Sequence, residues 1–295
     1  MLVMFLGLCF FQGFPKDPVD ARIVTSDITL FWESFDRMDQ GGNPFETYLA
    51  RGSQGVKDFI PERITSAEWL LEMVQKEKDY FEKIRASSFK SRQFVKQIRA
   101  SFYALEYWYP KATWPPVYFV IGATTSGGTA SKNGMIIGME TYADKAVKTS
   151  YGRPALDLDL LPFVVTHEMI HFLQKNQPKT LLDAVLLEGS ADFLAEMFAG
   201  EKVKLCNGPR VYAYGDRHEE KLWQEFKQVM YSEDYGPWLY GQTQAGCPQN
   251  LGYWMGYQIT QAYFNQARDK RKAVAEIIEM TDSRAFLKAS GYEKP

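Results

Sequence analysis

The sequence predicts an α+β protein that is mostly helical, with a small antiparallel sheet and one pair of helices that carries the chemistry. Apolar residues recur at helical spacing through most of the chain, whereas residues 117–121 and 135–139 are short apolar runs typical of buried strands. A flexible turn is expected between them, at residues 126–129. The chain is 45% hydrophobic, which is enough to bury a stable core in one large unit or two lobes.

Four regions follow from the order of these patterns, and the first is residues 1–14, a possible signal peptide. Residues 15–109 are expected to form an N-terminal helical region, residues 110–200 the core that carries the site, and residues 201–295 a C-terminal helical region. The boundary before the core is placed at residues 108–116, where prolines and aromatic residues interrupt the helical pattern. The helices of the first region are expected at residues 27–38, 66–85 and 88–107.

Two of the three histidines, His167 and His171, stand four positions apart in an apolar run that is predicted to be a helix. Residues at this spacing lie on one helix face, about one turn apart, so both imidazoles can reach a single metal ion. Glu168 projects about 100° round the helix, where it can take a proton from a metal-bound water without being a ligand. The motif therefore predicts a zinc site with a general base. The alternative is that buried histidines are hydrogen-bonded core residues.

Both helices of the predicted pair carry start and stop signals. Pro162 suits the first turn of the histidine helix, and residues 176–178 end it with a proline. Thr180 and Asp183 have the spacing of a capping box at the start of the next helix. Gly200 is a suitable stop for that helix.

The second helix offers the carboxylates that the first helix lacks. Glu188 and Asp192 share one face, so Glu188 can complete a two-histidine, one-carboxylate shell if the helices pack together. Asp192 can then accept the ring N–H of a zinc-bound histidine. Gly189 costs about 1 kcal/mol relative to alanine inside a helix. We expect close approach of the two backbones beside the metal to require it.

These motifs resemble those of a known clan of enzymes. His167-Glu168-x-x-His171 followed by Glu188-x-x-x-Asp192 resembles the gluzincin metallopeptidases. Residues 118–140 and 188–192 are more closely similar to a bacterial family of predicted zinc-dependent proteases. The resemblance covers about the middle third of the chain and implies a zincin-like core.

The resemblance also implies a role for each matching residue. His167, His171 and Glu188 would be the ligands of one Zn²⁺ per chain, Glu168 the general base, and Asp192 the partner of a ligand histidine. The 17 positions between His171 and Glu188 are slightly fewer than in the best-known members of the clan. The metzincin pattern fails, because glutamines occupy positions 174 and 177.

The segment before the histidine helix is expected to bind substrate. In the gluzincins an edge strand pairs with the extended substrate backbone, and residues 134–140 are assigned that role by resemblance. Gly138 and Glu140 also resemble the strand motif with which aminopeptidases hold a free amine. The alternative is that Glu140 is a solvated glutamate at the end of a strand.

A donor to the oxyanion of the transition state is expected from a tyrosine or a histidine. The candidates are His218, Tyr257 and Tyr253, of which Tyr253 is preferred because glycines surround it. The alternative is that these aromatic residues serve only in packing.

The N-terminus suggests export to the periplasm or the extracellular space. Residues 1–14 are uncharged and nearly all apolar, as in the hydrophobic region of a signal peptide, but no positive segment precedes them. Either the true start lies upstream, or this is a buried N-terminal segment. Lipid anchoring at Cys9 stays open, although leucine stands where a small residue belongs in residues 6–9. Cys206 and Cys247 could pair in an oxidising compartment.

Composition limits the remaining functions. The net charge of −2 and the absence of a basic run with interleaved aromatic residues argue against nucleic acid as a partner. No run of the sequence is long and apolar enough to be a transmembrane span. The sequence therefore predicts a zinc-dependent peptide hydrolase. The alternatives are a catalytically silent zinc-containing binding or envelope-associated protein, and a metal-free helical core in which the motif is a coincidence.

Overall fold

The structure is a computed structural model that describes residues 13–200, 209–240 and 248–292. Helices make up most of this described chain and four strands form one sheet, so the predicted α+β, mostly helical class is confirmed. No helix in these ranges is both long and apolar enough to cross a membrane. Cys9, Cys206 and Cys247, on which the predictions of lipid anchoring and of disulfide pairing depend, lie outside the described residues.

The sheet is mixed, which corrects the prediction of an antiparallel one. Its strands are β1 (Ile23–Val24), β2 (Val117–Val120), β3 (Gly128–Ser131) and β4 (Gly134–Gly138), in the order β1-β2-β4-β3. Strand β2 runs parallel to β1 and β4, and only β3 is antiparallel to its neighbour.

The strand at this edge of the sheet is β3, not β4, and β1 forms the opposite edge. Residues 128–131, whose first part was expected to be a flexible turn, pair with β4 from Gly128 opposite Ile137 to Ser131 opposite Gly134. Strand β4 therefore has a neighbour on each side, and the predicted edge-strand role of residues 134–140 is wrong. The reason is that only Lys132 and Asn133 separate the two strands, so residues 128–131 fold back on β4 as a hairpin and occupy its hydrogen-bonding groups on that side.

Six helices form the N-terminal part of the described chain. They are α1 (Ser26–Phe35), α2 (Phe45–Arg51), α3 (Gln54–Phe59), α4 (Ala67–Lys76), α5 (Lys78–Ser88) and α6 (Val95–Trp108). The single helix predicted at residues 66–85 is in fact two, α4 and α5, which meet at Glu77. This glutamate is buried, and its carboxylate accepts hydrogen bonds from the backbone N–H and the hydroxyl of Ser150. Its backbone departs from the helical conformation, which separates the two helices.

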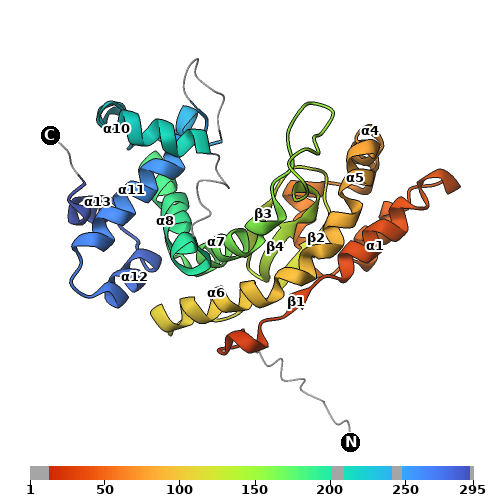
Figure 1. Cartoon of the computed structure of the whole chain (residues 1–295), viewed down its shortest axis with the longest axis horizontal. Coiled ribbons are helices and arrows are strands. Elements are labelled where there is room, and N and C mark those ends of the chain that lie inside the picture. The colour runs from red at the N-terminus through yellow and green to blue at the C-terminus, as the bar shows by residue number, and fades with distance from the viewer. Residues whose placement is uncertain (1–12, 201–208, 241–247, 293–295) are drawn as a thin grey trace, which may run out of the picture.

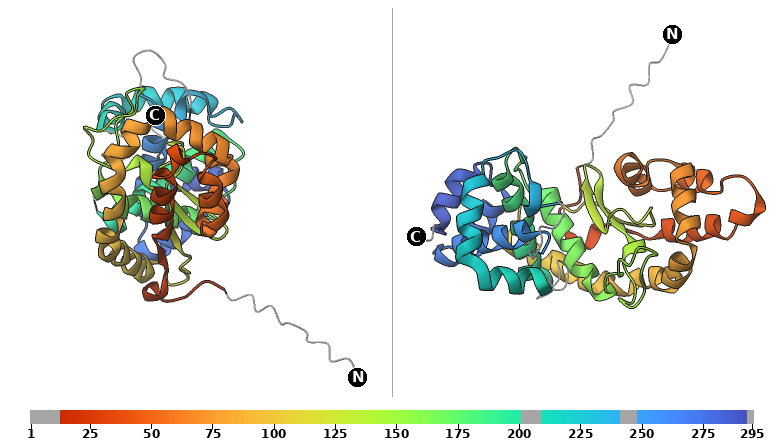
Figure 2. Two further views of the ribbon diagram at one scale, coloured as in Figure 1. Left: turned by 90° about the vertical axis from the view of Figure 1, so that its right-hand side faces the viewer. Right: turned by 90° about the horizontal axis from the view of Figure 1, so that it is seen from above.

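The remaining helices are α7 (Leu161–Leu173), α8 (Leu181–Ala199), α10 (Pro209–Val229), α11 (Leu251–Gln266), α12 (Lys270–Ile278) and α13 (Ser283–Ser290). Helix α7 packs against β3 and β4 on one side and against α8 on another. Helices α1, α4 and α5 lie towards one end of the molecule and α10 to α13 towards the other, with the sheet and α7 between them (Figures 1 and 2). The helix that carries both histidines thus joins the sheet to the C-terminal helices.

The predicted start signals hold in both helices of the pair and the predicted stop holds in α8, whereas α7 ends before its predicted stop at residues 176–178. Pro162 lies in the first turn of α7, and Thr180 and Asp183 form a reciprocal capping box at the start of α8. Gly200 ends α8 with a φ of 94°, a conformation that favours glycine. Helix α7 ends at Leu173, because Gln174 is already extended.

Gly189 does permit a close backbone approach, but its partner differs from the expected one. A Cβ at Gly189 would lie 2.2 Å from the carbonyl carbon of Gly256, and a Cβ at Gly256 would lie 1.9 Å from the carbonyl oxygen of Val185. The close pair is therefore α8 with α11, not α8 with α7. Spacing along α8 could not reveal this, because the partner helix lies more than 60 residues away in the sequence.

Candidate metal centre

Three side chains from α7 and α8 converge on one point. The Nε2 atom of His167 lies 3.4 Å from Oε2 of Glu188, and Nε2 of His171 lies 3.3 Å from the same oxygen. One donor atom from each of the three residues lies within 4.8 Å of the others. Ligands about 2.0–2.1 Å from a tetrahedral zinc ion lie about 3.3 Å from one another. The donor set therefore has the chemistry and the spacing of a zinc site.

Each histidine is held by a second residue on the far side of its ring. The Nδ1 atom of His167 lies 2.9 Å from Oδ1 of Asp192, and Nδ1 of His171 lies 2.7 Å from Oε1 of Gln174. A proton on Nδ1 of His171 is donated to Gln174, and a proton on Nδ1 of His167 faces the carboxylate of Asp192 at ion-pair distance. In each ring Nε2 then keeps its lone pair and faces Glu188. Both rings are thus oriented as metal ligands.

Sequence reasoning missed Gln174. The residue follows the last turn of α7, and its amide also donates to the carbonyl oxygen of Leu187, at 2.8 Å, and to the hydroxyl of Ser190, at 2.9 Å. It therefore ties the end of α7 to the middle of α8. Its position three residues after His171 was the available signal, because a side chain there can reach back to the last turn of the helix.

Tyr240 was also missed, and the sequence held no signal for it. Its hydroxyl donates a hydrogen bond to Oε1 of Glu188, the carboxylate oxygen that does not face the histidines. The residue follows the short helix η7 (Gly236–Trp238) in a loop, where no periodicity fixes the direction of a side chain. Tyr253, which the sequence did single out, stacks on His167 with ring centroids 6.5 Å apart.

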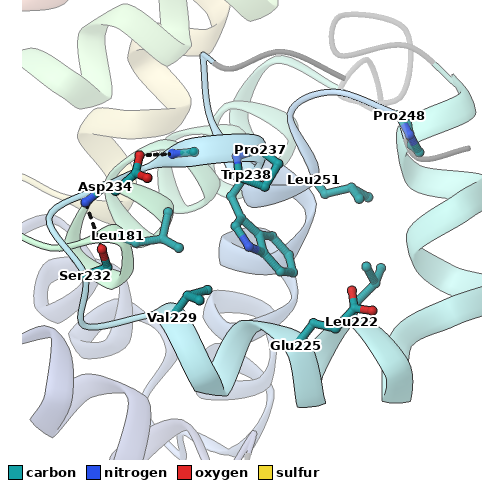
Figure 3. A pocket seen from close by; sticks show the side chains of 11 residues that line it. Leu181, Leu222, Glu225, Val229, Ser232, Asp234, Pro237, Trp238, Pro248 and Leu251 are labelled. Atoms are coloured by element: carbon teal, nitrogen blue, oxygen red, sulfur yellow. Dashed lines mark hydrogen bonds between the residues drawn. The ribbon is translucent and has the colours of Figure 1, made fainter. Parts of the chain in front are cut away.

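A hollow of about 340 Å³, lined by both apolar and polar side chains, lies against the short helix η7, two residues before Tyr240 (Figure 3). It is bounded by α10, η7 and the first residues of α8 and α11, and Trp238 forms one wall. The indole of Trp238 packs edge-on against Phe226 of α10, with centroids 5.0 Å apart. This packing fixes the chain two residues before Tyr240 and so helps to place its hydroxyl at Glu188.

The charges of the cluster favour a bound cation. Burial opposes the ionisation of Glu188, but His171 and His167 outweigh it and hold its pKa well below the ordinary value. Burial also opposes a charge on His167, but hydrogen bonds to Asp192 and Glu188 raise its pKa well above the ordinary value. Without a metal the cluster therefore retains protons, and a metal ion must displace them. Its affinity for a metal should fall as the pH is lowered.

Glu168 lies beside the cluster but outside the donor set. Its side chain packs against β3, where a Cβ at Gly128 would lie 2.7 Å from Oε1 of Glu168. Burial raises the pKa of this carboxyl, and the charges of His171 and His167 oppose that rise. The residue is thus close to the centre without being a ligand.

His218 and Gly138 lie elsewhere. His218 stands at a kink in α10, where its Nδ1 lies 2.8 Å from the carbonyl oxygen of Tyr214 and its ring stacks on Tyr214 at 4.1 Å. None of its described contacts is with the cluster. Gly138 ends β4, where a Cβ would lie 2.1 Å from the carbonyl oxygen of Ser126.

Glu140 is fully buried next to Gly138, with an exposure of 0%, so it is not the solvated glutamate that the alternative interpretation expects. Burial raises the pKa of its carboxyl to about 7, although the backbone N–H groups of Gly122 and Thr124 oppose the rise. The group is therefore mostly protonated in the folded protein at a pH where it is ionised in the unfolded chain.

This raised pKa predicts that Glu140 makes stability depend on pH. The carboxyl has a pKa of 4.5 in the unfolded chain and about 7 in the folded protein. As the pH rises between these two values, the unfolded chain releases a proton that the folded protein keeps, so stability falls. The full effect is about 3 kcal/mol. Urea unfolding from pH 4 to pH 8 should show Glu140→Gln gaining that amount relative to the wild type. Glu72→Gln, an exposed control, should show no such trend; equal pH profiles for Glu140→Gln and wild type would refute the assignment.

Taken together, the fold and the cluster define a mostly helical α+β protein with a candidate metal centre between two core helices. Residues 24–294 match the family described as Gliding motility protein GldB, a family of lipoproteins, and the chain belongs to that family. No curated protein and no solved structure matches the chain.

Membership of this family corrects the predicted activity. The matching family is one of gliding motility proteins and not of zinc metallopeptidases, so the assignment to the gluzincins and the prediction of a peptide hydrolase are wrong. The general base Glu168 and the oxyanion donors Tyr253 and His218 lose their catalytic roles with it. The physical reason is that two histidines and a carboxylate at these spacings are compatible with a metal site, and such a site can exist with or without hydrolysis. The zincin-like detail of the core stays a prediction.

The alternative of an envelope-associated protein agrees better with the family. Its members are lipoproteins, which is consistent with the predicted association with the cell envelope.

Proposed function

We propose that the chain is a non-catalytic lipoprotein of the cell envelope that serves gliding motility and holds one Zn²⁺ between His167, His171 and Glu188. The family supports the motility role and the lipid anchor, for which Cys9 is the candidate. The observation that carries the metal is the convergence of both Nε2 atoms on one oxygen of Glu188, at 3.4 and 3.3 Å.

In this proposal the bound metal ion stabilises the fold. Its two histidines lie on α7, which packs on the sheet, and its carboxylate lies on α8, which packs on α11. A bound zinc ion would supply a cross-link between these layers and lower the number of protons that the cluster must hold. Asp192, Gln174 and Tyr240 orient the three ligands, so little ordering would be needed when the ion binds.

A pair of variants separates this role from hydrolysis in gliding cells that depend on the protein. Glu168→Gln should leave gliding unchanged, because the residue is not a ligand and no proton transfer is required. His171→Ala should abolish or strongly reduce gliding, because it removes a ligand. Loss of gliding in Glu168→Gln at normal protein abundance and metal content would contradict the non-catalytic role. Normal gliding of His171→Ala would contradict the need for the metal.

A further inference from the structure

An arginine-lined hollow lies at the start of the described chain, far in sequence from the candidate metal centre. It has a volume of about 770 Å³ and is formed by residues 19–25 together with one face of α6 and the turn before it. Three arginines, Arg22, Arg92 and Arg99, line it, and Asp20 is the one carboxylate in the lining. The lining therefore carries a net charge of +2, from three positive groups and one negative group.

None of the three arginines forms an ion pair with a carboxylate in the described part of the chain. Arg99 donates to the carbonyl oxygens of Pro18, Val19 and Ala21, at 2.8, 2.7 and 3.1 Å, and so holds the short helix η1 (Pro18–Asp20) against α6. These bonds use its N–H groups but leave its charge without a counter-ion. The uncompensated positive charge of the hollow therefore favours the binding of an anion.

Arg92 and Arg22 are exposed and available to such an anion. Arg92 donates through Nε to the hydroxyl of Thr25, at 2.9 Å, and both residues line the hollow. Guanidinium groups bind phosphate oxygens through two parallel hydrogen bonds, so a pair of them suits a phosphate group. Val19 adds an apolar side chain beside them, with 52% of its surface exposed.

A lipid on Cys9 would hold this hollow close to a membrane, because the chain from Cys9 reaches the domain beside it. The backbone N–H and the indole of Trp114 donate to the carbonyl oxygens of Pro15 and Lys16, at 2.8 and 3.2 Å, so the chain leaves the domain beside the hollow (Figure 1). Pro18 lies nine positions after Cys9, and nine residues span at most about 30 Å. A lipid on Cys9 would therefore keep the arginines within about 30 Å of the bilayer.

We infer that this hollow docks on the phosphate groups of anionic phospholipids, with Val19 at the apolar boundary of the bilayer. A short tether raises the effective concentration of the domain at the surface, and each basic residue near an anionic membrane strengthens binding about five-fold. The docked domain has a defined face towards the lipid, with η1 and the N-terminal end of α6 at the membrane. Only the argument from reach rests on the proposed lipid anchor.

The test uses the full chain carrying Cys9→Ser, which cannot be acylated, and vesicles of phosphatidylcholine with or without phosphatidylglycerol. Co-sedimentation should show binding to the vesicles that contain phosphatidylglycerol, and weak or no binding to phosphatidylcholine alone. Adding Arg22→Gln and Arg92→Gln should weaken the binding about 25-fold, from two losses of about five-fold each. Arg99 is left intact because it holds η1 in place.

Adding Arg51→Gln, which removes an exposed arginine at the end of α2, is the matched control and should bind as the parent does. Equal binding by the parent and the Arg22/Arg92 variant would overturn the proposal, as would equal binding to both kinds of vesicle. An excess of inorganic phosphate should not release the protein; release would assign the hollow to free phosphate instead. Incorporation of labelled palmitate into the chain with Cys9 tests the anchor separately, so the two failures are distinguishable.

Discussion

Removal of zinc should lower the melting temperature of the protein by about 10 °C. A ligand at about 1,000 times its dissociation constant stabilises the folded state by about 4 kcal/mol, and 1 kcal/mol corresponds to roughly 2–4 °C in a protein of this size. The effect should be large here because the ligands belong to α7 and α8, two helices of the buried core. Thermal unfolding with zinc, with a chelator, and after zinc is restored measures the difference.

The third histidine of the chain provides a matched control for this experiment. His167→Ala combined with His171→Ala should melt at the same temperature with and without zinc. His218→Ala should keep the full response, because His218 contacts Tyr214 and not the cluster. A wild-type protein that melts at one temperature in zinc and in chelator would contradict a structural role for the metal.

Gly189→Ala should destabilise the protein by more than about 4 kcal/mol, which places it among the most damaging substitutions. The added Cβ would lie 2.2 Å from backbone atoms of Gly256 and Tyr257, which cannot move aside as a flexible side chain can. Helices α8 and α11 would have to separate along their most extensive contact, and Glu188 adjoins the displaced residue. Urea unfolding followed by circular dichroism gives the change in stability.

Gly256→Ala approaches the same contact from the other helix and should have an effect of similar size, since its Cβ would lie 1.9 Å from the carbonyl oxygen of Val185. Gly13→Ala is the control: nothing lies within 4 Å of its added Cβ, so stability should change by less than about 0.5 kcal/mol. If Gly189→Ala unfolds at the urea concentration of the wild type, the close helix contact is wrong.

The sequence could predict the candidate site to the extent that its geometry is local. His167 and His171 share a face because they lie one turn apart on one helix, and the same holds for Glu188 and Asp192. Tyr240 could not be predicted, because a loop places its hydroxyl at Glu188 and no periodicity describes that loop.

The errors in the predicted fold arise from contacts between distant segments. The glycine-rich residues 126–129 were expected to be a turn, but pairing with β4 makes Gly128 the start of an edge strand. Gly189 was assigned to the wrong helix contact, because Gly256 comes from a helix much later in the chain. Neither pairing has a signature in the spacing of nearby residues.

Activity could not be predicted from the donor set at all. The cluster of His167, His171 and Glu188 has the spacing of a zinc site, and Glu168 stands beside it as a base would. The same arrangement is compatible with a metal that only joins two helices. The prediction of hydrolysis was overturned by the family to which the chain belongs. Membership of that family is carried by residues 24–294 as a whole, and not by the few residues of the candidate site.

Metal content tests the central claim most directly. Elemental analysis by mass spectrometry of the protein purified without chelators should find one zinc per chain. The variant with His167→Ala and His171→Ala, purified in the same way, should contain none, and His218→Ala should contain the wild-type amount. Wild-type protein that stays free of metal after incubation with zinc, or a double variant with the same zinc content as the wild type, would contradict the account.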